Sequence, residues 1–243
     1  TMEKSIKKYF PIFALPTLVA FTIGFIVPFL MGIYLSFCEF TTVTDATFVG
    51  LKNYGRVFTD NTFIHALGFT ALFTVVSVLT INVFAFLIAM LLTKGIKGTN
   101  FFRTVFFMPN LIGGIVLGYM MIIYIAGIQN IPGDLIEAAK IDGANAWQVL
   151  KNVTIPMVMP SITICTFLTL TNSFKLFDQN LALTAGEPSN NSEMLALNIF
   201  DTFYGRNGWE GVGQAKAVLF FVLDPSMNLS EDSAEKIGLH CII

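Results

Sequence analysis

The sequence predicts an all-α fold, namely a polytopic bundle of transmembrane helices. Of its 243 residues, 54% are hydrophobic and only 12% are charged, against about 25% charged residues in an average soluble domain. The mean hydropathy is +0.70. Because a soluble core cannot bury this much apolar surface alone, membrane lipid must cover part of it.

Apolar runs of spanning length are the second observation behind this prediction. A helix needs about 20 residues to cross the hydrocarbon layer. Four runs reach that length: Ile12–Phe37, Ala66–Leu92, Val105–Ile128 and Ile155–Phe177. A fifth, Val212–Leu223, is too short alone. The first run is too long for a signal peptide and lacks a cleavage site, so we expect an uncleaved span, with kinks at Pro16 and Pro28.

Basic residues in the short loops give the orientation, because cytoplasmic loops carry an excess of Lys and Arg. Such residues precede the first run and follow the second: Lys4, Lys7, Lys8, Lys94, Lys97 and Arg103. Both of those chain segments, and the N-terminus, are therefore expected in the cytoplasm. The loop Glu39–His65 is then expected on the external side.

A polar stretch, Ile131–Pro156, interrupts the apolar pattern and predicts a helix, a turn and a second helix. Glu137 favours the positive N-terminal end of the first helix. Gly143 is expected to end that helix, because glycine adopts a positive φ at little cost. Asn145 can cap the second, short helix, which Pro156 is expected to close.

Small residues on the first of these helices leave room for a partner. Leu135, Ala138, Ala139 and Asp142 are expected near one face, where the alanines permit close approach and the acidic side chains offer charge. The alternative is an ordinary interfacial amphipathic helix, but such helices usually carry large apolar anchors and many Lys or Arg. The pattern favours docking to another protein.

These residues carry a resemblance to a known family. Three motifs resemble the EAA loop of the permease subunits of binding-protein-dependent ABC importers: Glu137-Ala138-Ala139, Asp142-Gly143-Ala144, and Ile155-Pro156 with Pro160. Two further stretches, Phe48–Tyr54 and Phe177–Pro188, resemble the maltose-type sugar permeases in particular. The resemblance extends to about Leu223, and the EAA loop is its most specific part.

The resemblance implies a non-enzymatic, multi-pass subunit that carries a sugar across the cell membrane of a bacterium or archaeon. In that family the EAA helix sits in a groove of a cytoplasmic ABC ATPase dimer, which holds the ATP and Mg²⁺, so no cofactor is expected in this chain. A second permease subunit and an extracytoplasmic sugar-binding protein are the other implied partners. Residues expected to contact or shape the ATPase joint are Glu137, Ala138, Ala139, Asp142, Gly143 and Ala144. We term Ile131–Pro156 the coupling segment.

The cytoplasmic side implied for the coupling segment conflicts with the order of the spans. A full crossing by Val105–Ile128 would carry this segment to the external side. Three resolutions stay open: the run is re-entrant, it crosses twice as half-helices, or two spans are missing from within it. The family has two further crossings between the counterparts of Tyr119 and Met121, which favours missing sequence.

The end of the chain also departs from the family, which has a complete last span and a basic tail. The run Val212–Leu223 gives way instead to a polar, acidic stretch. We therefore expect a permease domain over residues 1–223 and a polar tail, 224–243, outside the native fold.

Substrate contacts are expected in the fourth long run, because polar groups in a bundle face its interior. Thr169, Asn172 and Ser173 share one helical face, with Lys175 close by, and the substrate contacts of the family fall in this region. The alternative, that Thr and Asn only bond across helices, is equally open. Asn82 in the second run is expected to make that kind of bond.

Other functions have less support. A net charge of −2 offers no basic field for nucleic acid. Gly50 and Gly55 have P-loop spacing but lack the Lys-Ser or Lys-Thr that must follow. The histidines and cysteines are not spaced for a metal site or for disulfides. The alternatives are a secondary transporter or channel, which the absence of acidic or His residues at mid-span disfavours, and a non-functional truncated permease.

Overall fold

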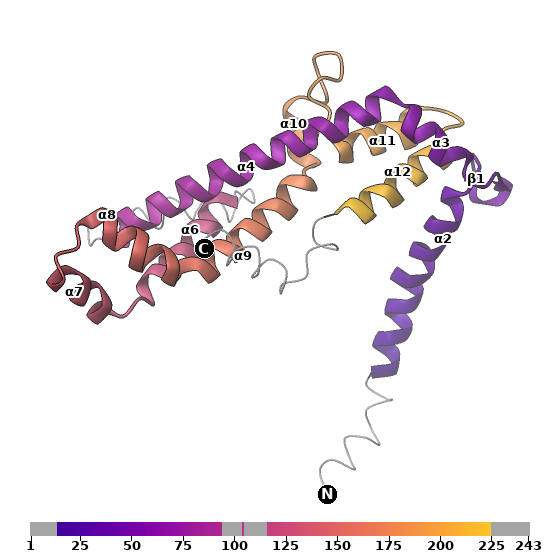
Figure 1. Cartoon of the computed structure of the whole chain (residues 1–243). Coiled ribbons are helices and arrows are strands. Elements are labelled where there is room, and N and C mark those ends of the chain that lie inside the picture. The colour runs from indigo at the N-terminus through magenta and orange to yellow at the C-terminus, as the bar shows by residue number, and fades with distance from the viewer. Residues whose placement is uncertain (1–13, 94–103, 105–115, 225–243) are drawn as a thin grey trace, which may run out of the picture. The chain divides into compact units, whose positions relative to one another are not determined.

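The computed structural model describes residues 14–93, 104 and 116–224, and most of them are helical (Figure 1). Three helices have the length and apolar composition of membrane spans: Ala14–Ser36, Asn61–Thr93 and Ala146–Phe174. They confirm three of the four predicted long spans. The basic residues used for the orientation, most of the first half of Val105–Ile128 and the tail after Asp224 lie outside the described residues. The described chain forms two units.

The first unit combines residues up to Leu67 with Phe177–Val222. Its elements are the π-helical turn η1 (Thr22–Ile26), α2 (Val27–Ser36), β1 (Cys38–Glu39), the 3-10 turn η2 (Val43–Asp45), β2 (Thr47–Phe48), α3 (Lys52–Thr59), the beginning of α4 (Asn61–Thr93), α10 (Asp178–Leu183), α11 (Leu195–Gly205) and α12 (Glu210–Leu223). β1 and β2 pair in antiparallel register. α12 has 14 residues, fewer than the about 20 of a span.

Buried asparagines fix the loops of this unit. Asn53 donates a hydrogen bond to the Cys38 carbonyl at 2.8 Å, which ties α3 to the chain that leaves α2. Asn180 donates to the Ser192 carbonyl at 2.7 Å and accepts from the Met194 amide at 2.9 Å. Both asparagines belong to the stretches that resemble sugar permeases, and the structure gives each a role in holding a loop.

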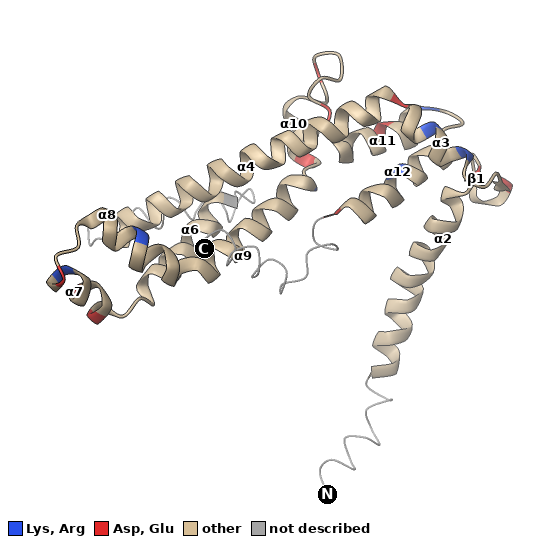
Figure 2. Ribbon diagram, viewed as in Figure 1, with Lys and Arg blue, Asp and Glu red and all other residues tan. Residues whose placement is uncertain are grey.

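The second unit contains the long membrane helices around one apolar core. Its elements are the remainder of α4, α6 (Val116–Gln129), α7 (Gly133–Ile141), α8 (Ala146–Val149), the π-helical turn η3 (Leu150–Thr154) and α9 (Ile155–Phe174). Core residues come from α4, α6 and α9, and they include Ala85, Ala89, Met120, Tyr124, Val158 and Cys165. Figure 2 shows that the helix bodies carry few charges, whereas α7 and its neighbouring turns carry several.

α4 and α6 both run toward the coupling segment. α6 is antiparallel to α9, because Met120 lies beside Cys165 while Gly127, further along, lies beside Ser161. α4 also runs opposite to α9 (Figure 1). The end of α4 and the coupling segment therefore lie at the same end of this unit, as a shared cytoplasmic side requires.

The structure describes only the second part of the predicted span Val105–Ile128, since residues 105–115 lie outside the described residues. The described part is α6, which has 14 residues and rises about 21 Å. Because α6 runs in the same direction as α4, it is not the return crossing that would follow α4 directly. The helix is continuous through Tyr119–Met121, where the resemblance locates missing sequence.

Two prolines lie within continuous helices, each shortly after a π-helical turn. The prediction that Pro156 closes a short helix is wrong, since α8, η3 and α9 form one helix, Ala146–Phe174. The Ile155 amide bonds to the Leu150 carbonyl five residues back. This wider turn makes room for the proline ring, which in a regular α-helix clashes with a preceding carbonyl. η1 precedes Pro28 in the same way.

Candidate functional site

The first helix of the coupling segment ends in a complete Schellman motif. The Ala144 amide bonds to the Ala139 carbonyl at 3.0 Å, and the Gly143 amide bonds to the Lys140 carbonyl at 3.1 Å. Gly143 has a φ of 80°, which glycine adopts without the penalty that a Cβ brings. The prediction that α7 ends at Gly143 is confirmed.

Asn145 starts the second helix through a reciprocal cap. Its side chain accepts from the Gln148 amide at 2.9 Å, and the Gln148 side chain accepts from the Asn145 amide at 2.8 Å. This capping box satisfies two backbone donors at the start of α8. Together with the Schellman motif, it fixes the corner between α7 and α8.

The six residues predicted for the ATPase joint lie on α7 and at this corner. Glu137, Ala138, Asp142 and Gly143 are exposed, whereas the two half-buried members are Ala139 and Ala144. The structure therefore brings the predicted residues together at one end of the second unit.

Large apolar side chains are exposed around the same corner. Ile141 is 85% exposed and Trp147 68%, and Leu135 on α7 is 44% exposed. The sequence pattern, with its small residues, suggested a surface without large apolar anchors, and these exposed side chains correct that expectation. Exposed apolar side chains beside acidic ones are typical of a surface that binds another protein.

Two isoleucines connect the coupling segment to the core of its unit. Ile131 is 9% exposed, and Ile136 of α7 packs against the core cluster that contains Tyr124 and Val158. Since close-packed interiors transmit displacement, these two residues join the coupling segment mechanically to the core cluster.

The four predicted pathway residues of α9 and the turn after it do not converge on one surface. Thr169 and Ser173 are buried, whereas Asn172 is exposed. Lys175 forms an ion pair with Asp224 at 2.7 Å. Only the two buried residues face the interior of the second unit.

Asn82 bonds across helices, as the sequence predicts. It accepts from the Tyr124 hydroxyl at 2.7 Å, and its amide lies 3.4 Å from the Thr169 hydroxyl. Thr169 in turn donates to the Cys165 carbonyl at 2.7 Å. This chain of bonds links α4, α6 and α9. Sequence reasoning missed Tyr124, because one tyrosine in an apolar run does not reveal its partner.

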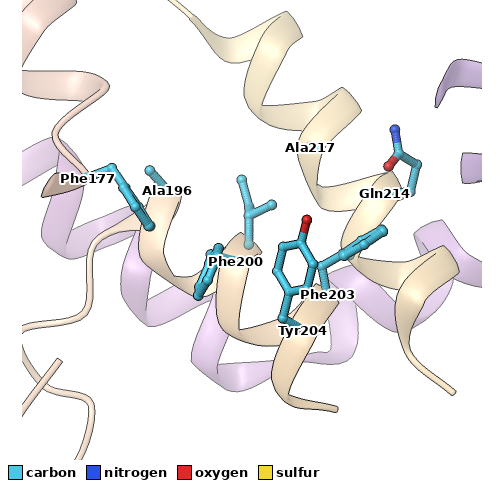
Figure 3. Close-up of a pocket in the computed structure, with 9 residues that line it drawn as sticks. Phe177, Ala196, Phe200, Phe203, Tyr204, Gln214 and Ala217 are labelled. Carbon is cyan, nitrogen blue, oxygen red and sulfur yellow. The ribbon is translucent and has the colours of Figure 1, made fainter. Parts of the chain in front are cut away.

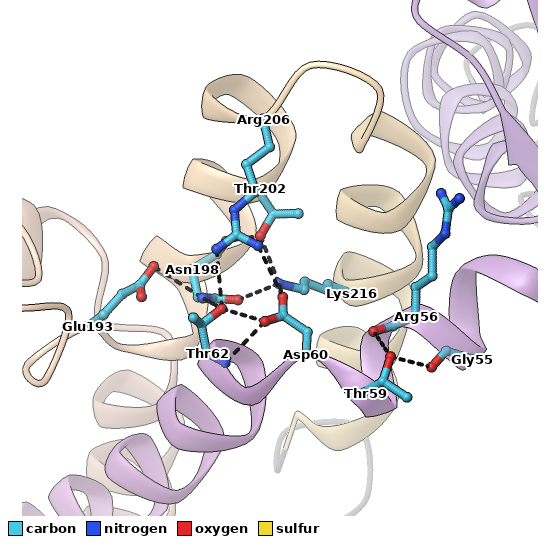
Figure 4. A network of polar contacts seen from close by, with 10 residues as sticks. All are labelled: Gly55, Arg56, Thr59, Asp60, Thr62, Glu193, Asn198, Thr202, Arg206 and Lys216. Atoms are coloured by element: carbon cyan, nitrogen blue, oxygen red, sulfur yellow. Dashed lines mark hydrogen bonds and ion pairs between the residues drawn. The ribbon is translucent and has the colours of Figure 1, made fainter.

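The first unit contains an ionic cluster that the sequence did not indicate (Figure 4). Lys216 is 0% exposed and donates to Asp60 at 2.8 Å and to Asn198 and Thr202 at 2.7 Å each. All three ammonium hydrogens thus have an acceptor. Arg206 approaches the same Asp60 carboxylate at 3.4 Å. We term these five residues the Lys216 cluster.

The pKa values of two carboxyl groups at this cluster shift in opposite directions. Burial alone would raise the pKa of Asp60, but hydrogen bonds from Lys216 and Thr62 outweigh it and hold the pKa below its ordinary value. Burial raises the pKa of Glu193, and the hydrogen bond from Asn198 offsets only part of that effect. Asp60 is therefore the charged partner that Lys216 requires.

Known transport proteins resemble this chain over most of its length. Residues 68–232 match the family described as binding-protein-dependent transport system inner membrane component. The probable starch degradation products transport system permease protein AmyD of Thermoanaerobacterium thermosulfurigenes is 40% identical, over 87% of this chain and 88% of its own length. The multiple sugar-binding transport system permease protein MsmF of Streptococcus mutans is 28% identical, over 92% and 94%.

One solved structure has the same fold. A bacterial ABC transporter involved in the import of the acidic polysaccharide alginate matches with a TM-score of 0.76 at 18% identity, over 99% of this chain and 98% of that chain. At such low identity the likeness concerns the fold alone.

The alignments to the relatives are longer than this chain. The match to AmyD extends over 259 positions and that to MsmF over 273, whereas the chain has 243 residues. Each relative therefore has positions without a counterpart here. AmyD aligns with 87% of this chain over 259 positions. About 50 of those positions therefore have no counterpart here, enough for two crossings of about 20 residues each.

Proposed function

Because this chain belongs to the family of binding-protein-dependent transport system inner membrane components, we propose that it is the permease subunit of an ABC importer for a sugar. The observation that carries the proposal is the exposed α7–α8 corner, held by its Schellman motif and capping box and joined to the bundle core. The printed names of AmyD and MsmF, which refer to starch degradation products and to sugars, support the substrate class.

The corner acts as the joint to a cytoplasmic ATPase dimer, which binds ATP and Mg²⁺. Ile141 and Trp147 enter the partner surface, while Ala138 permits close approach. When the ATPase closes, α7 moves, and Ile136 conveys this movement to the core between α6 and α9. The ligand-dependent shift between two arrangements of the bundle then moves the sugar. A second permease subunit and an extracytoplasmic binding protein complete the importer.

A bulky substitution on the exposed surface of α7 tests whether the ATPase binds there. Ala138→Trp is expected to reduce co-purification of the chain with its ATPase at least tenfold, because the new side chain keeps the two surfaces apart. Ala182→Trp, another exposed helical alanine outside the joint, is the matched control. If Ala138→Trp retains the ATPase as the control does, the joint is elsewhere.

The coupling of ATP hydrolysis to sugar uptake is tested separately, in a permease that is competent for transport. Gly143→Pro is expected to leave ATP hydrolysis intact but to abolish sugar uptake, because it breaks the turn that fixes the corner. Normal uptake by this variant would contradict the coupling role.

A second candidate, assembly with the partners without transport, is favoured by two observations. The relatives have about 50 positions that this chain lacks, about two crossings, and α6 runs in the same direction as α4, so it is not the return crossing. Uptake is measured for the chain and for a chimera that carries the corresponding AmyD segment after Tyr119. Transport by the chimera alone supports this candidate, and transport by the unaltered chain rules it out.

A further inference from the structure

A row of aromatic rings lines a cavity beside α11 and α12 (Figure 3). The cavity has a volume of about 340 Å³. Ring centroids are 5.4 Å apart from Phe177 to Phe200, 4.8 Å from Phe200 to Tyr204, and 4.9 Å from Tyr204 to Phe203. We term these four residues the aromatic row.

The aromatic row is open to a ligand. Tyr204 is 71% exposed and Phe200 41%, although rings of this size usually gain most stability when buried. The amide of Gln214 borders the same cavity. Among the described residues, neither this amide nor the Tyr204 hydroxyl has a hydrogen-bond partner. The Tyr204 hydroxyl is thus free to bond to a molecule lying on the rings, whereas the Gln214 amide packs against Gly32 of α2.

These features match the surface of a pyranose ring. One face of such a ring presents C–H groups, which pack on the electron-rich face of an aromatic ring, and its rim presents hydroxyls that require hydrogen bonds. A specific small-molecule site combines an apolar lining with a few placed polar groups in this way. The residues that line the cavity carry no charge, so an acidic sugar would find no counter-charge there.

We propose that the aromatic row is a binding subsite for a neutral oligosaccharide. Pyranose units stack on Phe200 and Tyr204, and the Tyr204 hydroxyl bonds to hydroxyls on the rim. The inference rests on the proposed function, because it deepens the substrate class from a sugar to a neutral chain of pyranose rings.

Binding of maltotetraose to the purified full chain tests the subsite, in a detergent without a sugar headgroup. The chain has two tryptophans, so Trp147→Phe leaves Trp209, between α11 and α12, as the single fluorescent reporter. Maltotetraose is expected to change its emission in a saturable way. Sorbitol, which offers hydroxyls without a ring face, is expected to have no effect.

Further substitutions in the Trp147→Phe chain test whether the change in Trp209 emission depends on the aromatic row. Tyr204→Ala is expected to weaken maltotetraose binding up to about tenfold, the value of one aromatic contact, while Tyr204→Phe, which keeps the ring, weakens it less. Phe58→Ala removes a ring that is 62% exposed outside the row and is the matched control. Far-UV circular dichroism confirms that each variant is folded.

Several results would overturn the subsite: no response to maltotetraose, equal affinity for Tyr204→Ala and the control, or an equal response to sorbitol or to a fatty acid. The last outcome would make the cavity a lipid site. A chain that retains its ATPase but binds no maltotetraose overturns only the subsite. A chain that binds maltotetraose but never retains the ATPase overturns the proposed function instead.

Discussion

At the scale of single residues, Lys216 shows what a fully buried charge requires. Removing an ammonium group from water costs several kcal/mol, and the cost is met only when an opposite charge and full hydrogen bonding compensate for it. Asp60, Asn198 and Thr202 supply that compensation. The four residues come from three separate parts of the chain, so the cluster also fixes how those parts pack in the first unit.

Removing the lysine charge should therefore be costly. Lys216→Met is expected to lower the free energy of unfolding by up to about 3–5 kcal/mol, because buried Asp60 loses its nearest cationic partner and keeps only the 3.4 Å contact with Arg206 as an ion pair. Adding Asp60→Asn should recover part of the loss. Thermal unfolding in detergent measures both effects.

An exposed ion pair is the control for this prediction. Lys52 pairs with Glu39 at 2.9 Å, but the two side chains are 51% and 41% exposed. Lys52→Met should therefore cost no more than about 1 kcal/mol. Equal effects of Lys216→Met and Lys52→Met would contradict the importance assigned to the Lys216 cluster.

The pKa of Asp60 predicts a loss of stability in acid. Because its pKa is lowered in the folded chain from an ordinary value of 3.8, its stabilising contribution is complete above that value and is lost as the pH falls below it. The stability difference between the chain and Asp60→Asn should thus shrink on acidification below about pH 4. The raised pKa of Glu193 acts in the opposite direction, so both proteins should carry Glu193→Gln.

At the scale of elements, Ile136 joins α7 to the core of the second unit. Ile136 packs on the core cluster, whereas Leu135 beside it is 44% exposed. Ile136→Ala should cost about 1 kcal/mol for its partly buried side chain and speed amide hydrogen exchange across Gly133–Ile141. Leu135→Ala should leave the exchange unchanged. Equal exchange in the two variants would mean that α7 is held by other contacts.

The coupling segment could be predicted because its turns depend on neighbouring residues. Features that depend on residues far apart in the chain could not be predicted from the sequence. Gly143 and Asn145 act within a few residues of their own position, so sequence reasoning found both the end of α7 and the cap of α8. The effect of Pro156 depends on how the preceding turn is wound, which composition does not reveal. Lys216 lies in an apolar run, and its acceptors are up to 156 positions away, so the Lys216 cluster was missed.

At the scale of the whole molecule, membrane orientation remains a prediction with a direct test. Leu51 and Ile141 are 70% and 85% exposed, and they belong to loops expected on opposite sides of the membrane. Leu51→Cys should react with an impermeant maleimide in intact cells, whereas Ile141→Cys should react only after permeabilisation. Reaction of both in intact cells would place the coupling segment outside.

The native cysteines need little change for that experiment. Cys38 and Cys165 are buried and should react slowly, so both labelling variants can be made in a Cys241→Ser background. That background without an added cysteine gives the baseline of labelling.

The π-helical turn η3 also sets the direction in which the coupling corner points. A π turn holds one residue more than an α turn, and each residue of an α-helix advances the phase by about 100°. Everything before η3 is therefore rotated by about that angle around the axis of α9, compared with an uninterrupted helix. Loss of a single residue such as Asn152 would turn the docking face away while changing no residue within it.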